Sequence, residues 1–189
     1  MISVEPAEGE ALFVSTREAL VFAFNYADQQ YAKSPMGSLY AVPGSGRGLT
    51  GVYGAGEAGM IMAEVMRLKP LEGDALCVRY TGVRSQCNCC GHEVDTSQVR
   101  DAIGRLIHYA AHQSANTGNL SLVRAIVRDY FGLERVGTAK LMAEQQDVHR
   151  NTVSNHSGKI KRALRMLERQ AEKNIDRLLQ GSGKVASEG

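Results

Sequence analysis

The feature that most constrains the fold is the run from Arg150 to Leu179, which contains no proline and is the longest helix candidate in the chain. Counting about 100° per residue from Val153 separates its side chains into two faces. One face is apolar and carries Ile160, Leu164, Leu167 and Ala171, with His156 at its edge. The pattern predicts a long amphipathic helix whose apolar face packs against the rest of the protein.

The opposite face of this helix is polar and basic rather than mixed in charge. Asparagine can bond adenine with two hydrogen bonds, and arginine suits guanine or phosphate. Gly158 costs roughly 1 kcal/mol relative to alanine in a helix, a loss that the close approach of a DNA backbone could offset. The alternative is an ordinary solvated face. The predicted contacts to double-stranded DNA are Arg150, Asn151, Ser154, Asn155, Lys159, Arg162 and Arg165.

The residues before the long helix favour a helix-turn-helix. Leu141 to Gln145 end a shorter helix, Asp147 occupies the turn, and Val148 is expected to be a buried anchor of the turn. Glycine is usual at the turn position. Aspartate is acceptable there because it adopts left-handed backbone conformations more readily than most residues.

The segment TVSNH, followed by Ile160 and Leu164, resembles the recognition helices of LuxR-type regulators and of sigma-factor region 4, over roughly residues 120–167. The resemblance implies that His156 packs in the core. Further along, Ile160, Leu164, Leu167, Ala171, Asn174 and Leu178 alternate steps of four and three residues, as in a short heptad seam. This seam could join two chains in a homodimer, with Asn174 setting the register, or it could pack within its own chain.

A cysteine cluster, SQCNCCGHE, occupies the middle of the chain. Thiolate and imidazole ligands on a tight turn suit tetrahedral zinc, and the spacing from Cys87 to Cys90 is that of a zinc knuckle. The remaining ligands are open: either Cys89 and His92, or His108 and His112 on the following helix. Buried or free thiols are the alternative. Cys77, in an apolar stretch, is expected in the core.

The rest of the chain predicts a mainly helical protein without repeats. Leu76 to Val83 reads as a possible strand, and 34–54 as a glycine-rich loop. Ser15 and Glu18 form a capping box before the first helix. The glycines of GAGEAG lack the strand that a dinucleotide site requires. Helices are expected at 16–33, 56–68, 95–113, 120–131, 136–145 and 150–179, within a helical region 1–74, a metal knuckle 75–115, a DNA-binding region 116–180 and a flexible tail 181–189.

The net charge of +2 hides a strong asymmetry along the chain. Residues 1–74 hold 5 Lys and Arg against 9 Asp and Glu, whereas residues 148–189 hold 9 against 4. A basic end beside an acidic one suggests a protein that touches DNA with one part and another partner with the other. The N-terminus lacks a secretion signal, and no apolar run is long enough to span a membrane, so a soluble cytoplasmic protein is expected.

The order of these parts is similar to that of the Q-type late-gene antitermination proteins of phages, on the strength of CNCCGH and DVHRNTVSNHSGKIKRAL. The resemblance implies binding near a promoter and engagement of the host RNA polymerase, without catalytic residues. One alternative is a dimeric DNA-binding repressor or activator. Another is a metal-dependent nucleic-acid enzyme, for which Glu93 and Asp95 would have to serve near the cysteines.

Overall fold

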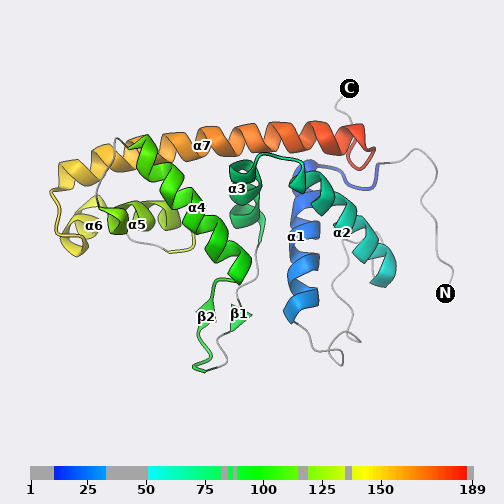
Figure 1. Cartoon of the computed structure of the whole chain (residues 1–189), viewed down its shortest axis with the longest axis horizontal. Coiled ribbons are helices and arrows are strands. Elements are labelled where there is room, and N and C mark those ends of the chain that lie inside the picture. Colours follow the sequence, from blue (N-terminus) through cyan, green and yellow to red (C-terminus); the bar gives the residue numbers. More distant parts are fainter. Residues whose placement is uncertain are drawn as a thin grey trace. The chain divides into compact units, whose positions relative to one another are not determined.

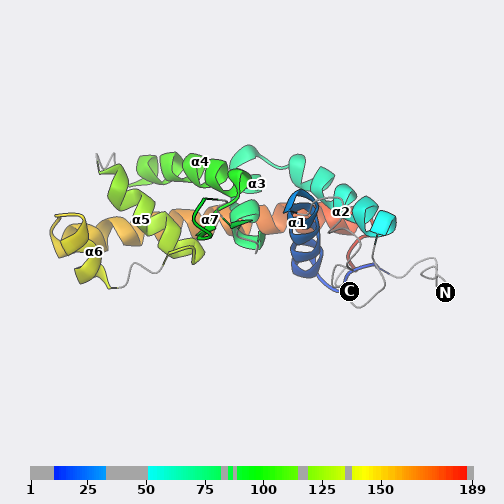
Figure 2. The same ribbon diagram turned by 90° about the horizontal axis from the view of Figure 1, so that it is seen from below.

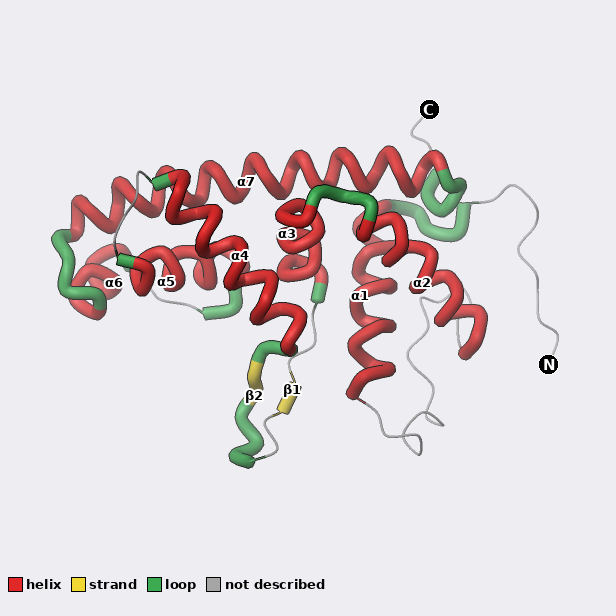
Figure 3. The backbone as a smooth tube through the Cα atoms, in the orientation of Figure 1, coloured by secondary structure: helices red, strands yellow, loops and turns green. Residues whose placement is uncertain are grey.

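The computed structural model describes residues 11–32, 51–81, 85–86, 89–114, 119–134 and 138–186. These residues are mainly helical, as predicted, and include one short hairpin (Figures 1 and 3). None of the described helices combines the length and apolar character needed to cross a bilayer. The elements are α1 (Thr16–Ala32), α2 (Gly51–Met66), α3 (Pro70–Tyr80), β1 (Ser85–Gln86), β2 (Glu93–Val94), α4 (Ser97–Gln113), α5 (Leu120–Phe131), α6 (Ala139–Gln145) and α7 (Arg150–Gly181).

Two segments differ from the sequence-based expectation. Leu76 to Tyr80, expected as part of a strand, belongs to α3, where four consecutive side chains from Ala75 to Val78 are all buried. A short apolar run of this kind does not distinguish a strand from a buried helix, whereas Pro70 at the first helical position favours a helix. The second segment is Gly51–Gly54, which begins α2 rather than ending a loop.

The chain divides into two compact units, and each combines segments that are distant in sequence. Unit 1 draws on residues 1–69, 80–93 and 172–189, and unit 2 on residues 70–79 and 94–171. The sequence analysis instead divided the chain into consecutive regions. Helix α7 contributes its first part to unit 2 and its last part to unit 1.

Unit 1 is built on α1 and α2, which pack together, and on the end of α7. Ser15 Oγ accepts a hydrogen bond from Glu18 N–H at 3.2 Å, as the capping box predicts. The Glu18 carboxylate, however, accepts from Val14 N–H at 2.9 Å. The largest fully buried side chains of this unit are Phe13, Leu20, Ile61, Ile175 and Leu179.

The residues after α7 are packed against unit 1, although 181–189 were expected to form a flexible tail. Gly183 has a φ of 71°, and Lys184 N–H donates to Leu179 C=O at 2.9 Å, which is the longer bond of a Schellman motif. The chain then forms a parallel bridge between Phe13 and Val185, and Val185 is 5% exposed. Residues 187–189 lie outside the described part.

Unit 2 has its core between α4, α5 and the first part of α7, where Leu106, Leu122, Ile126, Ile160 and Leu164 are buried. Figure 2 shows α4, α5 and α6 gathered about this part of α7. Side chains cap α4 and α5 at their N-termini: Thr96 Oγ1 accepts from Val99 N–H at 3.3 Å, and Asn119 Oδ1 accepts from Leu122 N–H at 2.9 Å. The first part of α7 is thus held by packing against α4 and α5.

Candidate nucleic-acid interface

A tight turn fixes the start of α7. Gln146 N–H donates to Met142 C=O at 3.1 Å, and Val148 N–H donates to Ala143 C=O at 3.0 Å. Between them Asp147 has a φ of 50°, a left-handed conformation that no other described residue besides glycine adopts. The left-handed backbone predicted at Asp147 is therefore present. Three residues after it, α7 begins.

His149 caps the N-terminus of α7, a role that the sequence analysis did not assign. Its Nδ1 accepts a hydrogen bond from Asn151 N–H at 3.2 Å, and its carbonyl oxygen accepts from Val153 N–H at 3.2 Å. Histidine is not among the preferred N-cap residues, so composition alone gave no signal for it. The cap satisfies one of the backbone donors that the first helical turn leaves open.

Burial around the turn differs in one respect from the prediction. Val148, expected as the buried anchor, is only half-buried. Val153, which lies one turn inside α7, is 1% exposed, and Met142 and Ala143 of α6 are buried as well. The buried anchor is therefore Val153, the first apolar residue of α7. Val148 lies between α6 and α7 and belongs to neither helix.

All seven residues predicted to contact DNA are exposed on the outer face of α7. Asn151, Ser154 and Asn155 lie near its start, on the side opposite Val153. His156 is half-buried at the boundary between the two faces. We call the exposed set the reading face: Arg150, Asn151, Ser154, Asn155, Lys159, Arg162 and Arg165.

The cations of the reading face have no ion-pair partner among the described residues. Elsewhere in unit 2, carboxylates are used in ion pairs within the protein. Asp129 Oδ2 lies 2.7 Å from Lys161 Nζ, which leaves the neighbouring Lys159 and Arg162 exposed and without such a contact. The outer face of α7 therefore presents uncompensated positive charge beside exposed amides.

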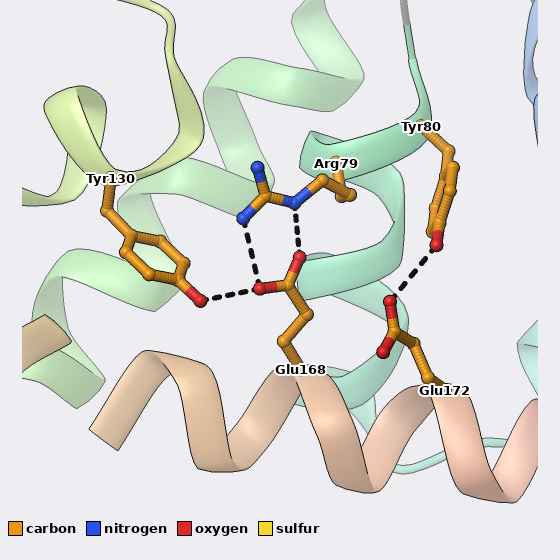
Figure 4. A network of polar contacts seen from close by, with 5 residues as sticks. All are labelled: Arg79, Tyr80, Tyr130, Glu168 and Glu172. Carbon is orange, nitrogen blue, oxygen red and sulfur yellow. Dashed lines mark hydrogen bonds and ion pairs between the residues drawn. The ribbon is translucent and has the colours of Figure 1, made fainter. Parts of the chain in front are cut away.

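A partly buried polar network centred on Glu168 holds the inner face of α7 in unit 2 (Figure 4). Arg79 of α3 donates two hydrogen bonds to the carboxylate of Glu168, one of them from Nη2 at 3.0 Å. Tyr130 OH of α5 donates to Glu168 Oε2 at 2.5 Å. Burial, followed by this hydrogen bond, raises the pKa of Tyr130 to about 12. No local pattern in the sequence indicates this network.

Burial along α7 matches the predicted heptad seam only in part. From Ile160 onward, the buried positions of α7 are Ile160, Leu164, Glu168, Ala171, Ile175 and Leu179, at steps of 4, 4, 3, 4 and 4 residues. Leu167, Asn174 and Leu178 are only half-buried. A straight α-helix drifts away from a seven-residue repeat, and α7 follows that drift. Because Ile160, Leu164 and Ala171 are buried within their own chain, they do not form a seam for a second copy.

The predicted zinc ligands within the described residues lie in two places. Cys89, Cys90 and His92 are exposed around the turn of the hairpin, where Gly91 has a φ of 70°, and Cys87 lies outside the described residues. The alternative ligands His108 and His112 are exposed on α4. Within the described part of the chain, no three His, Cys, Asp or Glu side chains are grouped to hold a metal ion. Zinc therefore stays a prediction from the sequence, while Cys77 is buried as expected.

Comparisons of the chain with protein-family models, with curated proteins and with solved structures found no match.

Proposed function

We propose that this protein is a sequence-specific DNA-binding transcription regulator that reads double-stranded DNA with the reading face of α7. The observation that carries the proposal is the division of the start of α7 into two faces. Val153, Ile160 and Leu164 are at most 1% exposed, whereas the reading face is exposed, and its cations pair with no described carboxylate. A helix held by one face and offering amides and guanidinium groups on the other suits the major groove.

The dimensions of the reading face agree with this role. Asn151 and Arg162 are separated by eleven residues, which corresponds to about 16 Å along a helix. The major groove is about 12 Å wide, so one groove accommodates Asn151, Ser154 and Asn155, and the following cations reach the flanking phosphates. In this arrangement the asparagines select bases, and Arg162 and Arg165 bind guanine or phosphate.

The more specific form of the proposal is antitermination: binding near a promoter followed by contact with bacterial RNA polymerase. It rests on the resemblance of CNCCGH and DVHRNTVSNHSGKIKRAL to the phage antitermination proteins. A repressor or activator, as a monomer or a dimer, is the alternative. Run-off transcription across a terminator separates these functions, because an antiterminator increases read-through by purified polymerase whereas a repressor only lowers initiation.

The nucleic-acid enzyme alternative needs Asp95 as a free carboxylate near the cysteines. Its Oδ2 lies 2.7 Å from Arg128 Nη1, and the Asp95 side chain is only 9% exposed. A carboxylate held by a guanidinium group is a poor candidate for a catalytic metal ligand. We therefore do not propose an enzymatic activity.

The direct test of DNA reading is selection of bound sites from a random duplex pool. The wild-type protein should enrich a defined sequence, and Asn151→Ala and Asn155→Ala should lose discrimination at one base pair each, by about 1–3 kcal/mol. Gln98→Ala and Gln113→Ala, which remove exposed amides from α4, are the matched controls and should enrich the wild-type sequence. Enrichment of no sequence by the wild-type protein would reject the proposal.

A further inference from the structure

The outer face of α7 carries cations well beyond the reading face. Arg165, Arg169, Lys173 and Arg177 follow one another at steps of four residues, and all four are exposed. Residues four apart lie on the same face of a helix, so this row continues the line of Lys159 and Arg162. We call Arg169, Lys173 and Arg177 the distal cations.

The carboxylates of α7, unlike these cations, contact other groups of the protein. The helix contains three of them, Glu168, Glu172 and Asp176, again at steps of four residues. Glu168 binds Arg79 and Tyr130, and Glu172 Oε1 accepts a hydrogen bond from Tyr80 OH at 3.1 Å (Figure 4).

Asp176 is the third of these acids. It accepts hydrogen bonds from Thr16 Oγ1 and from Gln180 Nε2, the latter at 3.0 Å. All three acids of α7 are therefore hydrogen-bonded to other groups of the protein, and none of them forms an ion pair with a cation of this row in the described structure. In the described part of the chain, no carboxylate pairs with Arg169, Lys173 or Arg177.

Such a row is unfavourable for the helix on its own. Like charges four residues apart repel one another, and three such pairs follow in succession from Arg165 to Arg177. A polyanion laid along the row would remove this repulsion and release counterions from its own phosphates. The charge pattern of α7 is thus better suited to a bound phosphodiester backbone than to the free helix.

The length of α7 places this contact outside the groove that the reading face would occupy. Asn155 and Arg177 are separated by 22 residues, or about 33 Å of helix. The major groove is only about 12 Å wide. We propose that the distal cations form a second nucleic-acid contact, which binds the phosphodiester backbone of a segment beyond the base-reading site. This inference rests on the proposed function, and the segment is the duplex DNA that flanks the base-reading site.

The test measures how affinity depends on salt. The full-length chain carrying Arg169→Gln, Lys173→Gln and Arg177→Gln is compared with the wild type for binding to a mixed-sequence DNA duplex of about four helical turns and to a single-stranded RNA of similar length. Glutamine keeps a high helix propensity, and circular dichroism checks the fold. Loss of three phosphate contacts should reduce the slope of log K against log salt by about 2.7 for duplex or about 2.1 for a single strand.

Each outcome decides the inference. A reduced slope on the duplex supports the inference, and a reduced slope on RNA alone overturns it in favour of a single strand. An unchanged slope on both probes, or no binding of either probe by the wild type, overturns the inference. The control variant Arg17→Gln, Lys69→Gln, Arg100→Gln removes the same charge from exposed sites off α7 and should keep the wild-type slope.

A separate variant, Lys159→Gln with Arg162→Gln, tests the reading face in the same assay. If its slope equals that of the wild type while the slope of the distal variant falls, the proposed function fails and the second contact stands. If the slope falls for the Lys159→Gln, Arg162→Gln variant and is unchanged for the distal variant, the proposed function stands and this inference fails.

Discussion

Lys161 Nζ lies 2.7 Å from Asp129 Oδ2, and this ion pair connects α7 to α5 within unit 2. Two residues earlier on the same helix, Lys159 is exposed and has no partner among the described residues. The two lysines carry the same charged group but differ in role. Lys161 helps to hold α7 in place, whereas Lys159 is available to bind a ligand.

This difference gives a matched pair of variants. Lys159→Gln should leave the free energy of unfolding unchanged and reduce the salt slope of DNA binding by about 1. Lys161→Gln should lower the free energy of unfolding by about 0.5–1 kcal/mol, since the pair is partly exposed, and should keep the slope. Urea unfolding and binding titrations at several salt concentrations measure both quantities. The interpretation of α7 is wrong if the two variants exchange these effects.

Substitution of Gly158 is expected to change stability and DNA affinity in opposite directions. A Cβ at this position meets nothing within 4 Å, so Gly158→Ala should raise the free energy of unfolding by up to about 1 kcal/mol. Because the added methyl group would stand between the helix and a DNA backbone, the same variant should bind DNA more weakly. Gly104→Ala in α4 also meets open space and should stabilise the protein with no loss of DNA affinity. Equal DNA affinity for both variants would show that Gly158 makes no close approach.

The Tyr130–Glu168 hydrogen bond predicts how stability depends on alkaline pH. Burial and this bond raise the pKa of Tyr130 from 10.0 to about 12, so the folded protein holds the phenol proton more tightly than the unfolded chain. The contribution is fully present below pH 10 and is lost as the pH rises from about 10 to about 12. Tyr130→Phe should therefore be less stable than the wild type at neutral pH, and the difference should shrink across this range.

Urea unfolding of both proteins at a series of alkaline pH values measures this effect. Tyr53→Phe, which alters a side chain that is 82% exposed on α2, serves as the control and should follow the wild type. A constant difference between Tyr130→Phe and the wild type up to pH 12 would contradict the prediction.

The zinc prediction is tested by metal analysis of the purified chain. If Cys90 is a ligand, the wild type should contain one bound zinc ion and Cys90→Ser should lose it, with reduced stability, because structural metal binding and folding are coupled. Cys77→Ser, at a buried position in α3, should keep the metal even if it weakens the core. Absence of zinc from the wild-type protein would exclude the site.

The sequence predicted much of unit 2 because its signals are local. The bounds of α5 match the periodic run from Leu120 to Phe131, and the left-handed backbone at Asp147 follows from the preference of a single residue. The exposed amides of α7 follow from its two faces. Each of these features is decided by residues within a few positions of one another.

The features that the sequence did not reveal depend on distant partners. From the sequence alone, a glutamate such as Glu168 is expected on the surface. Its partners in the structure, Arg79 and Tyr130, are 89 and 38 positions away in the chain. Near the end of α7, Ile175 and Leu179 are buried in place of the predicted Asn174 and Leu178, because this part of the helix belongs to the core of unit 1. The buried position of Val185 likewise depends on Phe13, at the other end of the chain.

The bridge between Phe13 and Val185 has a consequence for synthesis. Helices α1 and α2 leave the ribosome early, but the core of unit 1 also requires Ile175, Leu179 and Val185, which are translated after all of unit 2. Unit 2 has all its segments once residue 171 has emerged, so it can acquire its structure before the core of unit 1 is complete. The unit whose first helices are synthesised earliest is thus the unit whose core is completed later.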